Sequence, residues 1–114
     1  MEVTKAYFMI DVNDMKRAVA FYTEALGLGL RFSSPDWSEL TWRDATIALH
    51  SGRGNGGATG LGFEVDDLAA ACAAVKKAGG RVLTEPRARR GEFIRLAEVA
   101  DTEGNRFSLA EPAA

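Results

Sequence analysis

The sequence predicts an α+β domain in which one β-α-β-β-β module is used twice. Three observations predict this fold: an internal repeat, one amphipathic helix in each half, and strand-like runs on both sides of each helix. A chain of 114 residues is the right size for one domain. We therefore expect a single domain over residues 1–114, with modules at about residues 4–52 and 59–111.

The repeat is clearest where each half opens. Residues 8–15 align with residues 61–68, and Asp14 then falls on Asp67, at an offset of 53 residues. Apolar and small residues continue to match along the following helices, and each half then reaches glycine. Such self-similarity in a short chain predicts duplication of one structural unit.

Each half opens with a strand of alternating polarity. In residues 7–12, one face carries Phe8, Ile10 and Val12. Residues 60–65 repeat this period of two. Alternation of this kind predicts half-buried strands.

A helix follows each opening strand. Asp14 is a good N-cap because its carboxylate accepts hydrogen bonds from free amides of the first turn. Gly27 adopts the left-handed conformation that ends helices without strain. Asp67 and Gly79 are expected to do the same in the second half. Apolar residues recur at helical spacing between these ends, so each helix should pack one face on a sheet.

Three strand-like runs follow each helix. They cover residues 28–33, 37–43, 45–51, 81–85, 92–100 and 105–110. The strands are expected to form one curved mixed sheet with both helices on its convex face. The opposite, concave face would be open, and a concave sheet face is a natural small-molecule site.

Composition excludes several classes of function. The net charge is -2, whereas nucleic-acid-binding proteins show a basic surplus. Charged residues interrupt every apolar stretch, so we expect no membrane span. Cys72 is the only cysteine, which precludes an internal disulfide and fits a reducing cytoplasm.

Four stretches carry a family resemblance: residues 12–15, 21–28, 62–68 and 101–106. In them the chain resembles the glyoxalase, bleomycin-resistance and extradiol-dioxygenase group, the vicinal oxygen chelate superfamily. The last stretch reads Asp-Thr-Glu-Gly where the family usually has Asp-Pro-Asp-Gly. The resemblance covers nearly the whole chain and implies the two-module fold, a site on the open sheet face, and pairing as a homodimer.

Enzymes of this group hold a divalent metal with up to four His or Glu side chains on the open face. Motif matching puts those positions at Tyr7, Ala48, Gly60 and Ser108, and none of these is a usual ligand. The only histidine of the chain is His50, so a shift in register does not restore a two-histidine site. We therefore expect no metal and no other cofactor, and a protein that resembles the antibiotic-binding members.

Other residues join the predicted ligand-binding site through strand alternation. Met9 shares a face with Tyr7, and His50 shares one with Ala48. Trp37 and Trp42 fall on opposite faces of one strand, and we choose Trp42 for the site, although the sequence does not settle which one lines it. The predicted ligand-binding set is Tyr7, Met9, Trp42, Ala48, His50, Gly60, Glu64 and Ser108.

Some of these residues also have purely structural explanations. Glu64 and Arg106 could be a surface pair at the rim, and His50 a strand-end histidine satisfied by water. Arg87, Arg89 and Arg90 could clamp an anion, although charge runs in loops are more often solvated.

Three functions remain open, and the catalytic residues stay unassigned. The first is a metal-free binding protein for a small, aromatic or polycyclic molecule such as an antibiotic. The second is an enzyme, either a metal-independent lyase or isomerase that transfers protons through Tyr7, His50 or Glu64, or a diverged metal-dependent enzyme. The third is an interaction module without a ligand, in which side chains fill the concave face of the sheet.

Overall fold

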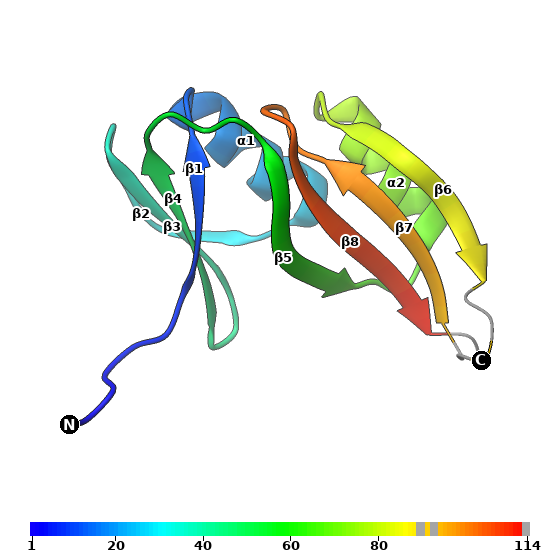
Figure 1. Cartoon of the computed structure of the whole chain (residues 1–114), viewed down its shortest axis with the longest axis horizontal. Helices are drawn as coiled ribbons and strands as arrows, with labels where there is room; N and C mark the ends of the chain where they lie inside the picture. Colours follow the sequence, from blue (N-terminus) through cyan, green and yellow to red (C-terminus); the bar gives the residue numbers. More distant parts are fainter. Residues whose placement is uncertain (89–90, 92–93, 113–114) are drawn as a thin grey trace.

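The computed structural model of the chain describes residues 1–88, 91 and 94–112, and it shows the predicted module twice (Figure 1). The first module contains β1 (Phe8–Val12), α1 (Met15–Leu26), β2 (Gly29–Ser33), β3 (Trp37–Trp42) and β4 (Ala45–Ser51). The second contains β5 (Gly57–Glu64), α2 (Leu68–Lys77), β6 (Arg81–Ala88), β7 (Ile94–Ala100) and β8 (Asn105–Pro112). The predicted α+β class and the repeated β-α-β-β-β order are confirmed.

The strands form two four-stranded sheets rather than one continuous sheet. Their orders are β1-β4-β3-β2 and β5-β8-β7-β6. In each module the opening strand pairs in parallel with the last strand, and the remaining pairs are antiparallel. Each sheet is thus mixed, as expected. The break falls between β1 and β5, because each of these strands is an edge strand bonded to its own module.

Both helices begin at the predicted caps. The Asp14 carboxylate accepts a bond from the Arg17 amide at 3.1 Å, and Asp67 caps α2 in the same way. Gly27 ends α1 with a φ of 66°, as its sequence position predicted. The second helix ends slightly earlier than predicted, with Ala78 as its C-cap and Gly79 next at a φ of 97°.

One hydrophobic core joins the helices to the sheets. The ring of Phe21 on α1 lies 6.3 Å from that of Phe107 on β8, so α1 packs against both modules. The largest fully buried side chains include Phe21, Tyr22, Leu40, Leu49, Leu68 and Leu109. Because the helix-facing sides of both sheets share this core, the two modules form one packed unit.

Polar contacts from the β7–β8 turn also fasten the first module to the second. The buried Tyr22 hydroxyl donates to Asp101 Oδ2 at 2.7 Å. The Glu103 carboxylate accepts from the backbone amides of Asn13 and Asp14, just before α1 begins. Asn105 Nδ2 donates to the carbonyl of Asp11 at 3.2 Å. The turn therefore fixes the start of α1 and, with it, the end of β1.

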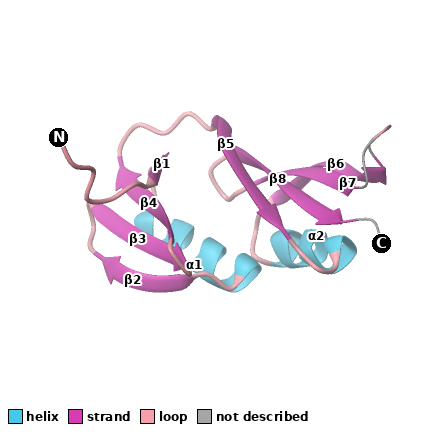
Figure 2. Cartoon of the chain, turned by 90° about the horizontal axis from the view of Figure 1, so that it is seen from below, coloured by secondary structure: helices cyan, strands magenta, loops and turns pink. Residues whose placement is uncertain are grey.

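The helices lie together on one side of the molecule, and the sheets cover them on the other (Figure 2). Each sheet thereby has one face on the core and one face that points away from the helices, which we call its open face. Neither helix in the described part of the chain is long and apolar enough to cross a membrane.

Candidate functional site

The strand register aligns side chains in rows across the open face of the first sheet. Where β1, β4 and β3 run side by side, consecutive rows on this face are Asp11–His50–Trp37 and Met9–Ala48–Glu39. Four predicted site residues therefore come together on this face: Tyr7, Met9, Ala48 and His50. Ala48 is fully buried even on this face.

Trp37 is the centre of an aromatic group on this face. Its ring meets that of Tyr7 edge-on, with centroids 5.6 Å apart, and that of His50 at 6.2 Å. Its indole nitrogen donates to Glu39 at 2.9 Å, which fixes the orientation of the ring. Tyr7, Met9 and Phe32 are each about half exposed, at 51%, 53% and 52%. The face thus offers ordered aromatic surface to the outside.

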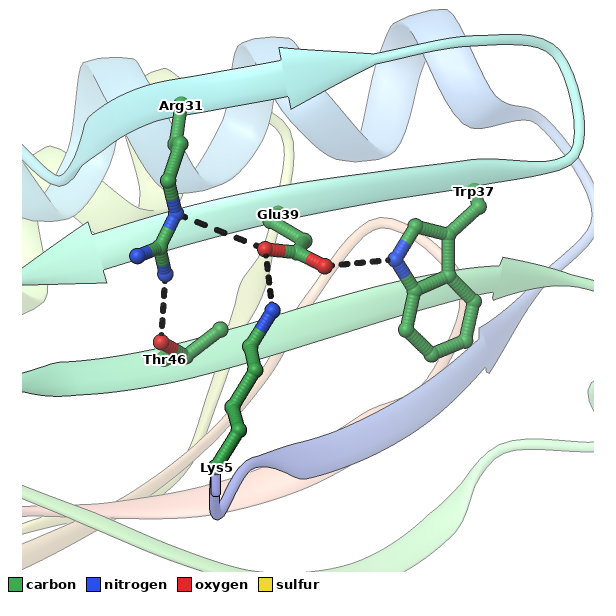
Figure 3. A network of polar contacts seen from close by, with 5 residues as sticks. All are labelled: Lys5, Arg31, Trp37, Glu39 and Thr46. Atoms are coloured by element: carbon green, nitrogen blue, oxygen red, sulfur yellow. Dashed lines mark hydrogen bonds and ion pairs between the residues drawn. The ribbon is translucent and has the colours of Figure 1, made fainter.

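Glu39 organises a polar network beside the aromatic group (Figure 3). One carboxylate oxygen lies 2.7 Å from Lys5 Nζ and 3.4 Å from Arg31 Nε, and the other accepts from Trp37. Arg31 also donates to the hydroxyl of Thr46 at 2.5 Å. The hydrogen bonds from Lys5 and then from Trp37 hold the pKa of Glu39 below its usual range. Glu39 is therefore a fixed anion between two cations.

His50 and Asp11 form a second polar pair on the same face. His50 Nδ1 lies 3.0 Å from Asp11 Oδ1, and both side chains are about half exposed. A carboxylate at Nδ1 fixes the ring and leaves Nε2 to meet a ligand. Gly52 lies against this pair, since a Cβ there would be 3.2 Å from Asp11 Oδ1. His50 thus shares this face with Ala48, as strand alternation predicted.

Trp42 lies on the opposite face from this group. The β3–β4 register is unbroken from Trp37 to Trp42, and five residues of strand place the two rings on opposite faces. Trp42 is 58% exposed and borders an apolar pocket of about 380 Å³ between the modules. Phe8 and Glu64 border the same pocket.

Gly60 and Ser108 lie on the second module. Both border a shallow pocket of about 280 Å³, and Ser108 also borders a larger one of about 520 Å³ with Arg87 and Glu98. Arg106 faces Glu98 at 3.7 Å and not Glu64, so the suggested Glu64–Arg106 rim pair is wrong.

The arginine cluster suggested as an anion clamp is described only in part. Arg87 belongs to β6 and borders the larger pocket. Arg89 and Arg90 lie outside the described residues.

The predicted metal positions do not supply a metal site. Tyr7 and Ala48 are on the first module, whereas Gly60 and Ser108 are on the second. Alanine and glycine have no donor atom in their side chains, and a neutral phenol and a serine hydroxyl are poor ligands for divalent ions. Within the residues that the structure describes, no three His, Cys, Asp or Glu side chains gather closely enough to hold a metal ion. The donor set does not fit the family's metal.

Sequence reasoning missed three residues of the first sheet's open face, Lys5, Arg31 and Glu39, and it considered Trp37 but left it out of the predicted set. The alternation in residues 37–42 does put Trp37 and Glu39 together, but it does not say which face of the strand meets the helix. Lys5 precedes β1, and Arg31 adjoins a bulge in β2. No pattern in the sequence marks either residue.

Known proteins share the sequence family and the fold of this chain. Residues 5–109 match the model of the Glyoxalase/Bleomycin resistance protein/Dioxygenase superfamily. The chain belongs to this superfamily. The resemblance found in the sequence is thereby confirmed.

Curated relatives within the superfamily are named as lyases. Lactoylglutathione lyase of Salmonella typhimurium is 28% identical over 90% of this chain and 88% of the relative. A probable chloroplastic lactoylglutathione lyase of Arabidopsis thaliana is 32% identical over 88% of this chain. The match spans only 33% of that longer protein.

Solved structures share the whole architecture. TnmS3, an antibiotic binding protein from Streptomyces sp. CB03234, superimposes with a TM-score of 0.78 at 25% identity, over 97% of both chains. The fosfomycin resistance protein FosX of Listeria monocytogenes has a TM-score of 0.79 at 16% identity, over 97% of this chain and 94% of that one. The FosX likeness shows the fold alone. The superfamily thus includes antibiotic-binding proteins and lactoylglutathione lyases.

Proposed function

We propose that the protein binds a small, flat organic molecule, such as an aromatic metabolite or antibiotic, on the open face of its first sheet and without a metal. The observation that carries the proposal is the fixed position of Trp37. Its ring is held between Tyr7 and His50, and its nitrogen is bonded to Glu39. A rigid aromatic surface loses little conformational entropy when a flat ligand stacks on it.

The side chains at the family's metal positions support metal independence. Ala48 and Gly60 have no side-chain donor, and Tyr7 and Ser108 are weak ones. The likeness to TnmS3, described as an antibiotic binding protein, supports the binding proposal. The names of the curated relatives favour the enzymatic alternative considered below.

A homodimer is part of the same proposal. The open faces belong to two separate sheets of one chain. β1 is an edge strand, and its residues Phe8 and Met9 are exposed, as is Tyr7 just before it. A second copy that lays its pocket at Ser108 over Trp37 would complete a groove. Light scattering after size-exclusion chromatography tests this, and a monomer at micromolar concentration would contradict it.

A cytoplasmic location also remains a proposal. Cys72 is free and buried, which suits a reducing compartment. Immunoblots of fractionated cells test the location, and protein in the secreted fraction would contradict it.

Tryptophan fluorescence tests the binding site directly, because the chain has only two tryptophans and they lie on opposite faces. In the Trp42→Phe variant, the signal comes from Trp37 alone. We expect saturable quenching when flat aromatic compounds are added in the presence of a chelator. The Trp37→Phe variant is the matched control, and its Trp42 signal should not respond. A response from Trp42 alone would place the ligand in the pocket between the modules and refute the proposed site.

The His50–Asp11 pair favours a second candidate, a metal-independent enzyme that transfers protons. A histidine oriented by a carboxylate can accept or donate a proton at Nε2. Proton exchange into bound aromatic compounds in deuterated water, followed by nuclear magnetic resonance, tests this activity. Loss of exchange in His50→Gln, with binding retained, would support the enzyme. No exchange in the unmodified protein would exclude this role for the pair.

A further inference from the structure

We propose that the ligand is an aromatic acid whose anionic group lies between Lys5 and Arg31. This inference rests on the proposed binding function and names the chemical class of ligand. The anionic group would bind at one end of the aromatic surface, and the aromatic ring of the ligand would stack on the surface itself.

The first argument is the arrangement of charge around Glu39. Lys5 Nζ and Arg31 Nε lie 2.7 Å and 3.4 Å from the same carboxylate oxygen. Two cations against one carboxylate leave one positive charge without a partner inside the network. Both cationic side chains remain accessible, with 42% and 49% of their surface exposed, whereas Glu39 is only 15% exposed. The network therefore presents positive charge to the outside.

The second argument is that the two cations are already held in place. Arg31 is fixed through Nε by Glu39 and through one terminal nitrogen by Thr46. The guanidinium has five N–H donors in a fixed fork, so donors remain for a further acceptor. A planar carboxylate is the group that such a fork binds best. Prior fixation lowers the entropic cost of binding it.

The third argument is the position of the cations relative to the aromatic rings. Lys5 Nζ lies 5.9 Å from the centroid of Tyr7, and Glu39 is bonded to both Lys5 and Trp37. Lys5 thus lies over the ring of Tyr7, and Glu39 links it to Trp37, so a ring that stacks on Trp37 has Lys5 beside it.

The other carboxylate on this face does not oppose an anion at that end. Asp11 is bonded to His50, in the row of Trp37. Arg31 reaches Thr46, four residues earlier on β4 than His50. The face is therefore polarised along the strands, with the exposed cations at one end.

A matched pair of probes tests this inference: 2-naphthoate and its neutral amide, 2-naphthamide. Titrations by nuclear magnetic resonance or calorimetry at low ionic strength give both affinities. We expect naphthoate to bind about tenfold more tightly, since a hydrogen bond to a charged group is stronger than one to a neutral amide. The preference should shrink as salt is added, because the cations are partly exposed. Equal affinities, or tighter binding of the amide, would overturn the inference.

Substitutions then assign the preference to individual residues. Arg31→Gln and Lys5→Gln should each remove most of the preference for naphthoate and leave the affinity for naphthamide within about twofold. Arg81→Gln, which removes an exposed arginine of the second module, is the control and should keep the preference. A preference that survives both site substitutions would contradict the assignment.

The outcomes also separate this inference from the binding proposal. Neutral aromatic compounds that quench Trp37, with no preference for the acid, would overturn the inference alone. If no aromatic compound, charged or neutral, changes the Trp37 signal, both proposals fail.

Discussion

Replacing Tyr22 with phenylalanine should weaken the attachment between the two modules. The hydroxyl of Tyr22, on α1, donates to the buried carboxylate of Asp101 in the second module at 2.7 Å. The Tyr22→Phe variant keeps the ring, which packs against Phe21 and Phe107, and removes only this hydrogen bond. Its effect therefore reports on one polar contact.

The size of the effect follows from the burial of both partners. Tyr22 is fully buried, and Asp101 is 3% exposed. A hydrogen bond to a charged group contributes about 1.5–3 kcal/mol, and the carboxylate that loses its donor stays buried. In a domain of this size that loss lowers the melting temperature by about 6–12 °C. The remaining donors to Asp101, the amides of Glu103 and Asn105 and the Asn105 side chain, keep the loss toward the lower value.

Urea unfolding followed by circular dichroism measures this loss at neutral pH. Tyr7→Phe is the matched control, because Tyr7 is half exposed, and it should change the free energy of unfolding by less than about 0.5 kcal/mol. A Tyr22→Phe variant as stable as this control would refute the reasoning.

Alkaline pH gives an independent check on the same residue. Burial, followed by the charge of Asp101, raises the pKa of Tyr22 far above its ordinary value. The folded protein thus keeps this proton where the unfolded chain, with a pKa of about 10, loses it. The stability contribution is present below about pH 10 and falls by about 1.4 kcal/mol for each pH unit above it. Tyr22→Phe lacks this loss, so the gap between the two proteins should narrow as pH rises, and a constant gap would contradict the assignment.

Two further substitutions test how the modules are held together. Glu103→Ala removes the acceptor for the amides of Asn13 and Asp14 and should lower the free energy of unfolding in urea by about 1–2 kcal/mol. An unchanged free energy of unfolding would mean that water caps these amides equally well. Gly80→Ala should lower the free energy of unfolding by about 2 kcal/mol or more, because the added Cβ would lie 2.5 Å from the carbonyl oxygen of Ala100. Gly62→Ala is the control: its added Cβ would have no atom within 4 Å, and the loss should be less than about 1 kcal/mol. Equal melting temperatures for these two glycine variants would contradict the close approach of Gly80 to Ala100 and Val75.

The fold could be predicted from the sequence because its signals are local. Asp14, Asp67 and Gly27 are read directly as helix ends, and residues 7–12 show their buried face by alternation. The separation into two sheets could not be predicted in this way, because strand patterns do not show which edges bond to one another. The C-cap of α2 is Ala78, one residue before the predicted Gly79.

The candidate site could be predicted only in part, because it depends on long-range register. Tyr7, Met9, Ala48 and His50 were found by alternation and by family motifs. The sequence could not decide between Trp42 and Trp37, because residues 37–42 carry one tryptophan on each face, and only the packing shows that Trp37 lies beside Tyr7 and His50. The Glu39 network joins segments that are far apart in the sequence, so no local sequence pattern predicts it.

The measurement that tests the central claim most directly is the melting temperature of the protein with chelator, with divalent metals, and with a panel of aromatic compounds. A compound that binds only the folded protein raises the melting temperature, and the stabilisation grows with the logarithm of 1 + L/Kd, where L is the free concentration of the compound. We expect aromatic compounds, and aromatic acids most of all, to raise the melting temperature in the presence of chelator. The Trp37→Ala variant should lose this response. A rise with a divalent metal alone, reversed by chelator, would contradict the account and indicate a metalloenzyme.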